Sequence, residues 1–160
     1  MESSENREVG ALLSEFLAID DLKKLAADAG TLLDCPIIVI DDTYHVSAHY
    51  LPLGFSDKLF CDAVRQGVIT CEAGALIAES PALVAGNSDY ISFGESPYRR
   101  RFSPLVSAGV RLGYLICVDV DGKLDEIPGE TWRIVEAILA KQLFVEASRQ
   151  DKPFETAEDI

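Results

Sequence analysis

Two runs of strand-forming residues, at positions 36–50 and 99–120, lie between helical segments at both ends of this 160-residue chain. Each run contains two stretches rich in β-branched and aromatic residues with a turn between them, which is typical of a β-hairpin. Because the hairpins and the helices are segregated along the chain, the sequence predicts a single α+β domain. We expect a central antiparallel sheet of about five strands, with terminal helices on one face and a helical insert, residues 51–98, on the other.

The two most apolar stretches, residues 37–40 and 114–118, predict the centre of the sheet. Neither alternates between apolar and polar residues, and such continuous runs are typical of strands buried on both faces. We therefore expect these two strands to be neighbours. Pro104 has no backbone N–H to donate, so its strand is expected near a margin of the sheet or at a bulge. Residues 44–50 do alternate, which predicts one face with Tyr44, Val46, Ala48 and Tyr50 and another with His45, Ser47 and His49.

Capping residues and glycines predict where the helices begin and end. Asp20 and Asp21 precede a helix that Gly30 can end, and two further helices fall within the insert. A short edge strand, residues 90–93, follows them. The expected helices are residues 22–29, residues 57–66 capped by Ser56 and ended by Gly67, residues 71–79 capped by Thr70, and a long last helix over residues 128–149.

The chain divides into three expected parts. Residues 1–19 have apolar side chains three and four apart, which predicts an amphipathic helix for dimerisation. Residues 20–150 form the domain, and residues 151–160 begin a linker to an output domain outside this chain. In the last helix, Ile134 and Phe144 lie off the main apolar stripe, so one sheet face cannot cover them all. We therefore expect a homodimer through the N- and C-terminal helices.

Charge excludes two classes of partner. Lys and Arg total 14 against 27 Asp and Glu, a net charge of −13, which repels phosphate backbones and anionic lipid. The second insert helix carries Glu72 and Glu79 and no basic residue, so it is not expected to read DNA.

No apolar run approaches the roughly 20 residues that cross a bilayer, and the first ten residues do not resemble a secretion signal. We expect a cytoplasmic protein without direct contact to nucleic acid or membrane.

The sequence shows no catalytic or metal-binding motif, so we expect no enzyme, no metal and no cofactor. The four cysteines form no CxxC pair. Cys61 and Cys71 are each followed by an acidic residue, which disfavours a reactive thiolate. His45 and His49 lie about 13 Å apart along a strand, too far to share an ion. A thiol-based methionine sulfoxide reductase of the GAF type is the remaining enzymatic alternative.

Several segments carry a resemblance to a known family. They are the run 32–41 leading into Val46-Ser47-Ala48, the run 103–106, the run 112–118 and the long last helix. In this order they resemble the GAF/PAS-like sensor domains that precede the helix-turn-helix output domain of bacterial transcription regulators of the purine-catabolism regulator (PucR) type. The resemblance implies a domain that senses a small molecule and signals through its terminal helices to a DNA-binding domain. It carries over no ligand-binding residue.

The candidate ligand contacts come from the residues themselves. Arg99, Arg100 and Arg101 form the one concentrated positive charge in an acidic chain, and Arg99 and Arg101 share a strand face. If that face lines a cavity, their guanidinium groups can bind a carboxylate or a phosphate, which suggests an anionic ligand. The alternative is that they offset neighbouring acidic side chains on the surface. The full candidate set is His49, Tyr50, Phe60, Arg99 and Arg101.

Two functions from different classes remain open at this point. The first is a sensor whose ligand binds between the sheet and the insert. The second is a ligand-free dimerisation module that brings output domains together. A small molecule that copurifies with the protein separates the two, and a solid core without a cavity argues against sensing.

Overall fold

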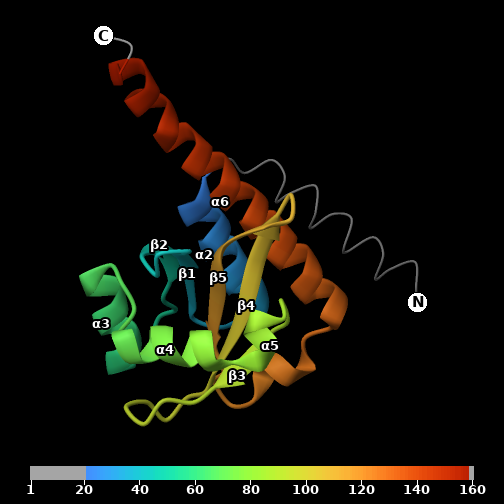
Figure 1. The fold of residues 1–160 in the computed structure, drawn as a ribbon. Coiled ribbons are helices and arrows are strands. Elements are labelled where there is room, and N and C mark those ends of the chain that lie inside the picture. The colour runs from blue at the N-terminus through green and yellow to red at the C-terminus, as the bar shows by residue number, and fades with distance from the viewer. Residues whose placement is uncertain (1–20, 159–160) are drawn as a thin grey trace.

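The computed structural model describes residues 21–158, with side chains described as far as Arg149. The predicted helix at residues 1–19 lies outside this part of the chain. Figure 1 shows the strands lying side by side, with helices on both sides of them. The elements in chain order are α2 (Leu22–Leu33), β1 (Ile37–Asp41), β2 (Val46–Tyr50), α3 (Lys58–Gln66), α4 (Cys71–Glu79), α5 (Pro81–Val84), β3 (Asp89–Ile91), β4 (Arg100–Ser107), β5 (Val110–Val118), a 3-10 helix η1 (Lys123–Glu126) and α6 (Gly129–Glu158).

The five strands form one antiparallel sheet in the order β2-β1-β5-β4-β3. Strands β1 and β5 are neighbours, with Ile37 opposite Cys117 and Ile40 opposite Tyr114. Residues 37–40 and 114–118 are buried throughout. The α+β class, the strand number and the central pair are therefore confirmed.

Helices cover both faces of the sheet, and each face has its own core. Helices α2 and α6 pack on one face, around Leu25, Leu115 and Leu139. The insert helices α3, α4 and α5 pack on the other, around Phe60, Ile77 and Leu83. This placement agrees with the expected layers, terminal helices on one side and the insert on the other (Figure 1).

A bulge in β2 overturns the predicted alternation of its side chains. Val39 lies opposite Ala48, but Ile40 lies opposite Val46, so Ser47 is an extra residue. One extra residue moves all side chains beyond it to the other face. Tyr50 and Ala48 therefore pack with α2 and α6. Val46 and Tyr44 pack with the insert, so the prediction of a single shared face is wrong.

The helix ends differ from the predicted ends at two caps. Helix α2 continues through Gly30 to Leu33, and Asp34 in the left-handed conformation ends it. Gly30 is needed for packing instead, because a Cβ there would lie 2.2 Å from the ring of Tyr50. Helix α3 is capped by the Asp57 side chain rather than by Ser56. The caps at Thr70 and Gly67 are confirmed.

Pro104 lies beyond the end of the pairing between β3 and β4. Strand β3 reaches only as far as Phe102, so Pro104 has no β3 partner. On its other side it lies opposite Tyr114, and a register shift between Leu105 and Val106 follows directly. Position near the margin and the adjacent bulge both agree with the expectation for proline.

Helix α6 is longer than the face it covers. Its 30 residues span about 45 Å at 1.5 Å per residue. Side chains from Trp132 to Leu143 join the core, while Phe144 is 44% exposed. The backbone stays helical across the boundary predicted at residue 150, and Figure 1 shows this end of α6 projecting beyond the sheet. In the part of the chain that the structure describes, no helix has the length and apolar character needed to cross a membrane.

The close approach of β5 to β1 leaves no room for a side chain at Gly113. A Cβ there would lie 1.9 Å from the carbonyl oxygen of Ile40, which is backbone and cannot turn aside. We expect Gly113→Ala to lower the free energy of unfolding by about 3 kcal/mol, measured by urea denaturation. Gly129→Ala is the matched control, because nothing lies within 4 Å of its Cβ position. Equal stability of the two variants would contradict this packing.

Candidate functional site

Three consecutive arginines make most of the buried polar contacts of the sheet; Arg99 precedes β4, and Arg100 and Arg101 begin it. Side chains alternate across a strand, so Arg100 points to the opposite face from Arg101. Arg101 lies opposite Cys117 on the α6 side, and Arg100 lies opposite Val118 on the insert side. One short run of sequence therefore serves both layers of the molecule.

Arg99 holds the connection that leads from β5 into α6. Its Nε donates to Asp119 Oδ2 at 2.7 Å and its Nη2 donates to Asp125 Oδ2 at 2.8 Å. The guanidinium carbon lies 3.9 Å from the centre of the Tyr90 ring. The hydrogen bond to Asp119 raises the pKa of Arg99. This arginine is thus occupied by two carboxylates and an aromatic ring.

Arg101 joins β4 to the last helix. Its Nη1 donates to Glu136 Oε2 at 2.9 Å and also to the hydroxyl of Ser103. The guanidinium carbon lies 3.8 Å from the centre of the Trp132 ring, within the range of a cation–π contact. Glu136 and Trp132 both belong to α6, so the contact fixes the first half of that helix on the sheet.

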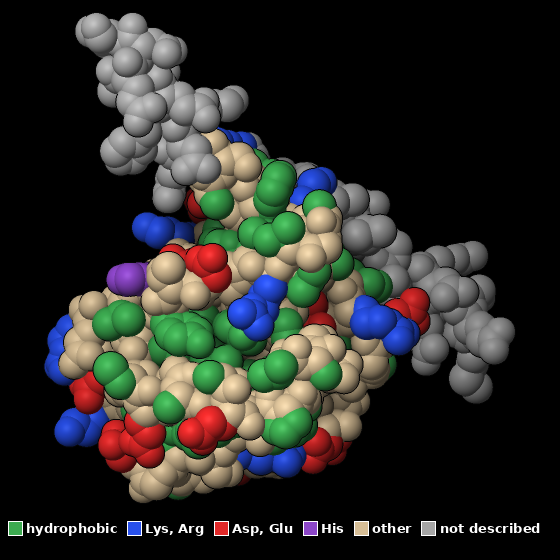
Figure 2. All heavy atoms as spheres, in the orientation of Figure 1, with side chains coloured by type: hydrophobic (Ala, Val, Ile, Leu, Met, Phe, Trp, Pro, Cys, Tyr) green, Lys and Arg blue, Asp and Glu red, His purple; other side chains and the backbone are tan. Residues whose placement is uncertain are grey.

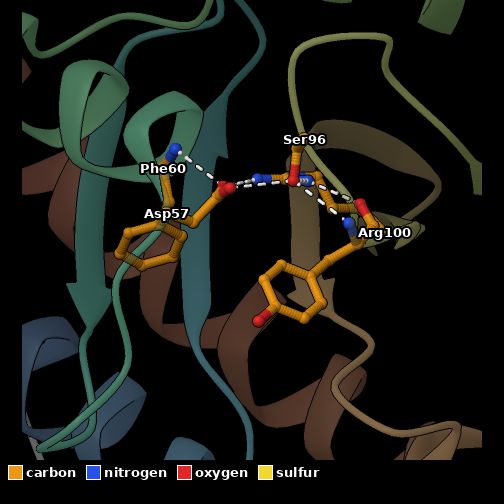
Figure 3. A network of polar contacts seen from close by, with 5 residues as sticks. Asp57, Phe60, Ser96 and Arg100 are labelled. Carbon is orange, nitrogen blue, oxygen red and sulfur yellow. Dashed lines mark hydrogen bonds and ion pairs between the residues drawn. The ribbon is translucent and has the colours of Figure 1, made fainter.

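Arg100 forms a buried ion pair with Asp57, shown in Figure 3. The side chains are 5% and 3% exposed, respectively. Arg100 Nη1 also donates to Ser96 Oγ at 3.0 Å and to the carbonyl of Tyr98 at 2.8 Å. Burial lowers the pKa of Arg100, and the charge of Asp57 opposes that effect. Buried charges of this kind are retained only when they are paired and hydrogen-bonded.

Asp57 connects this ion pair to the start of α3. Its Oδ2 accepts a hydrogen bond from the backbone N–H of Phe60 at 3.2 Å, the usual contact of an N-cap. Its Oδ1 accepts from Ser96 Oγ at 2.8 Å. One carboxylate therefore caps α3 and pairs with β4. It also holds the β3–β4 loop through Ser96.

An apolar cavity lies beside this network, between the sheet and the insert. Its volume is about 30 Å³, enough for a water molecule and far below the roughly 300 Å³ of a typical ligand pocket. Arg100 is the one charged residue in its lining. The lining residues are Ile38, Leu59, Phe60, Ala63, Ile69, Thr70, Ala73, Phe93, Arg100, Phe102 and Ile116.

The structure brings together two of the five predicted contact residues. His49 and Phe60 line one shallow groove of about 180 Å³ beside α3, and Phe60 also lines the apolar cavity. Tyr50 lies on the other face of the sheet, against Gly30. Arg99 and Arg101 do not line the cavity, because acidic side chains on the α6 side hold them.

Arg100 and Asp57 are absent from the contact residues predicted from the sequence. Alternation along a strand predicts that Arg100 points to the opposite face from Arg99 and Arg101. The local sequence does not show which of the two faces is covered by the insert. An apolar residue at position 102, two residues after Arg100, is a signal that this strand face is buried. In the structure the Phe102 ring packs against Phe93, with 6.2 Å between the ring centres. Asp57 was expected to lie in the first turn of its helix, where its side chain does not cap.

The four cysteines fall into two environments. Cys35 and Cys117 are buried, and burial raises the pKa of the Cys117 thiol well above its usual value. Cys61 on α3 and Cys71 on α4 are exposed. Among the described residues, no group of three or more His, Cys, Asp or Glu side chains is arranged to hold a metal ion.

Comparison with known proteins adds no assignment. The chain matches no family model, and no curated protein is similar enough to identify a relative. The resemblance to GAF/PAS-like sensor domains therefore stays a prediction.

The buried ion pair predicts a large loss of stability when one partner is removed. Arg100→Met leaves the Asp57 carboxylate buried without its counter-ion, and we expect a loss of about 3–5 kcal/mol in urea denaturation. Asp57→Asn/Arg100→Met should recover most of it, because asparagine caps α3 as well as aspartate. Arg65→Met, in an exposed pair with Asp62, should change stability by about 1 kcal/mol or less. Equal losses for Arg100→Met and Arg65→Met would disprove the buried pair.

Thiol reactivity should divide the cysteines into the same two environments. In the native protein at pH 8, we expect a disulfide reagent such as Ellman's reagent to modify Cys61 and Cys71 without unfolding, because both thiols are exposed. Cys117 should react only after unfolding, because burial keeps its thiol protonated as well as inaccessible. Peptide mapping after a short pulse measures the pattern. Fast native modification of Cys117 would contradict the packing of β5.

Proposed function

We propose that this domain senses a small molecule and regulates an output domain attached to the end of α6. The observation that carries the proposal is the apolar cavity between sheet and insert, with a buried cation at its edge. Ligand sites commonly combine apolar walls with a few placed polar groups. The resemblance to sensor domains of PucR-type regulators supports the same function.

The cavity is too small in this structure to hold a ligand, so sensing requires the insert to move. A volume of about 30 Å³ holds no metabolite. The ligand must therefore favour an arrangement in which α3 and α4 stand farther from the sheet. It shifts the equilibrium only by the difference in its affinity for the two arrangements.

The insert also exposes several apolar side chains. Leu51, Leu53 and Val84 are exposed, so part of its apolar surface is unpaired in the closed arrangement. Figure 2 shows hydrophobic side chains reaching the surface between charged ones on this side of the molecule.

Strand β4 offers a short path from the insert to α6. Arg100 contacts the insert and the adjacent Arg101 contacts Glu136 and Trp132 of α6. A shift of β4 caused at Arg100 is transmitted to α6 through one peptide bond. The projecting end of α6 then carries the change toward the output domain, which we propose binds DNA and lies outside this chain.

We further propose that the protein works as a cytoplasmic homodimer joined by its terminal helices. Phe144 is 44% exposed at the point where α6 leaves the sheet. This same observation favours the second candidate function, a dimerisation module without a ligand. The two candidates differ only in whether a small molecule changes the domain.

The test of sensing is a ligand search combined with a filled cavity. Native mass spectrometry is used to look for a copurified small molecule, and a metabolite library is screened by thermal shift. A ligand at a hundred times its Kd should stabilise the domain by about 2.7 kcal/mol. We expect Ala63→Val, which narrows the cavity, to abolish that stabilisation.

Ala78→Val on α4 is the matched control, since Ala78 is an exposed helical alanine outside the cavity lining. It carries the same loss of helix propensity as Ala63→Val. Equal ligand responses from both variants would place the ligand elsewhere. A domain that copurifies with nothing and responds to no compound, yet dimerises, would support the dimerisation module.

A further inference from the structure

The carboxylate of Asp57 occupies a site that suits a carboxylate from any source. It accepts hydrogen bonds from the Arg100 guanidinium, from Ser96 Oγ at 2.8 Å and from the Phe60 N–H at 3.2 Å. These donors lie on three separate segments, β4, the β3–β4 loop and the start of α3 (Figure 3). Such a convergence of donors on one carboxylate is typical of anion recognition.

The same arginine borders the apolar cavity. Arg100 and Phe60 belong both to the polar network and to the cavity lining. A molecule that places a carboxylate on Arg100 therefore has apolar walls directly beside it, formed by Ile38, Phe102 and Ile116 of the sheet. A carboxylate head group and a compact apolar body match these two halves.

We propose that the ligand is a small monocarboxylate with an apolar body, and that its carboxylate replaces that of Asp57 on Arg100. This inference rests on the proposed function and specifies its ligand class. The exchange keeps Arg100 paired, because one carboxylate leaves as another arrives. A neutral ligand that displaced Asp57 would leave the arginine buried without a counter-ion.

The exchange also supplies the movement that sensing requires. Asp57 is the N-cap of α3, so its departure from Arg100 frees the first turn of that helix from β4. The apolar body of the ligand then fills the space that opens as α3 moves outward. In the absence of ligand, Asp57 acts as an internal competitor that holds the insert closed.

Asp57→Asn is the decisive variant, because asparagine keeps the cap and removes the competing charge. Formate and acetate serve as head-group probes, and isovalerate and benzoate add an apolar body. Isovaleramide and benzamide are the neutral counterparts, and chloride controls for ionic strength. Thermal shift and calorimetry measure binding at matched concentrations.

We expect isovalerate or benzoate to stabilise the wild-type domain, and to bind Asp57→Asn about tenfold or more tightly. Acetate should stabilise Asp57→Asn by less than these larger acids do. The amides and chloride should have no effect, and Asp57→Asn/Arg100→Met should respond to none of the acids. If Asp57→Asn folds only in the presence of ligand, refolding in benzoate compared with benzamide provides the same comparison.

Three outcomes would overturn the inference. Carboxylates that act no better than chloride on Asp57→Asn would show that Arg100 takes only its own partner. Equal effects of acid and amide would leave cavity sensing intact and remove carboxylate recognition. Acetate acting as strongly as benzoate would exclude the apolar cavity. Failure of the proposed function itself is recognised separately, by the absence of any response to neutral or charged compounds in the library screen.

Discussion

A buried guanidinium must keep a counter-ion, and this requirement at Arg100 organises one half of the molecule. Asp57 meets it from 43 residues away and is at the same time the cap of α3. The Arg100–Asp57 ion pair thereby connects the start of the insert to β4. Without a carboxylate at this position, the guanidinium would be buried without a counter-ion or would have to reach water.

The three arginines contact three different parts of the structure, because Arg100 and Arg101 point to opposite faces of β4 and Arg99 precedes the strand. Arg99 holds the β5–α6 connection, Arg100 holds the insert and Arg101 holds α6. Each guanidinium is matched to acidic side chains, so the cluster does not form a free positive patch in an acidic protein. The layers on opposite faces of the sheet are consequently linked through adjacent residues of one strand.

Some of this architecture could be predicted from sequence because it depends on local pattern. The continuous apolar runs at 37–40 and 114–118 identified the central strands, and Thr70 and Gly67 identified helix ends. The bulge at Ser47 could not be predicted, because the alternation of side chains in residues 44–50 does not show how these residues pair with those of β1. The Asp57–Arg100 ion pair could not be predicted either, because it depends on how two segments that are distant in the sequence pack together. Of the candidate contacts, Phe60 lines the cavity. Among the three arginines, the predicted contacts are Arg99 and Arg101, whereas the residue that lines the cavity is Arg100.

The position of Trp132 has a practical consequence. It is the single tryptophan of the chain, buried beneath the guanidinium of Arg101 at the junction of β4 and α6. Indole emission depends on nearby charge and on access of water. The protein therefore contains an intrinsic fluorophore at the contact between the sheet and α6, and a shift of α6 on the sheet would change its emission without any added label.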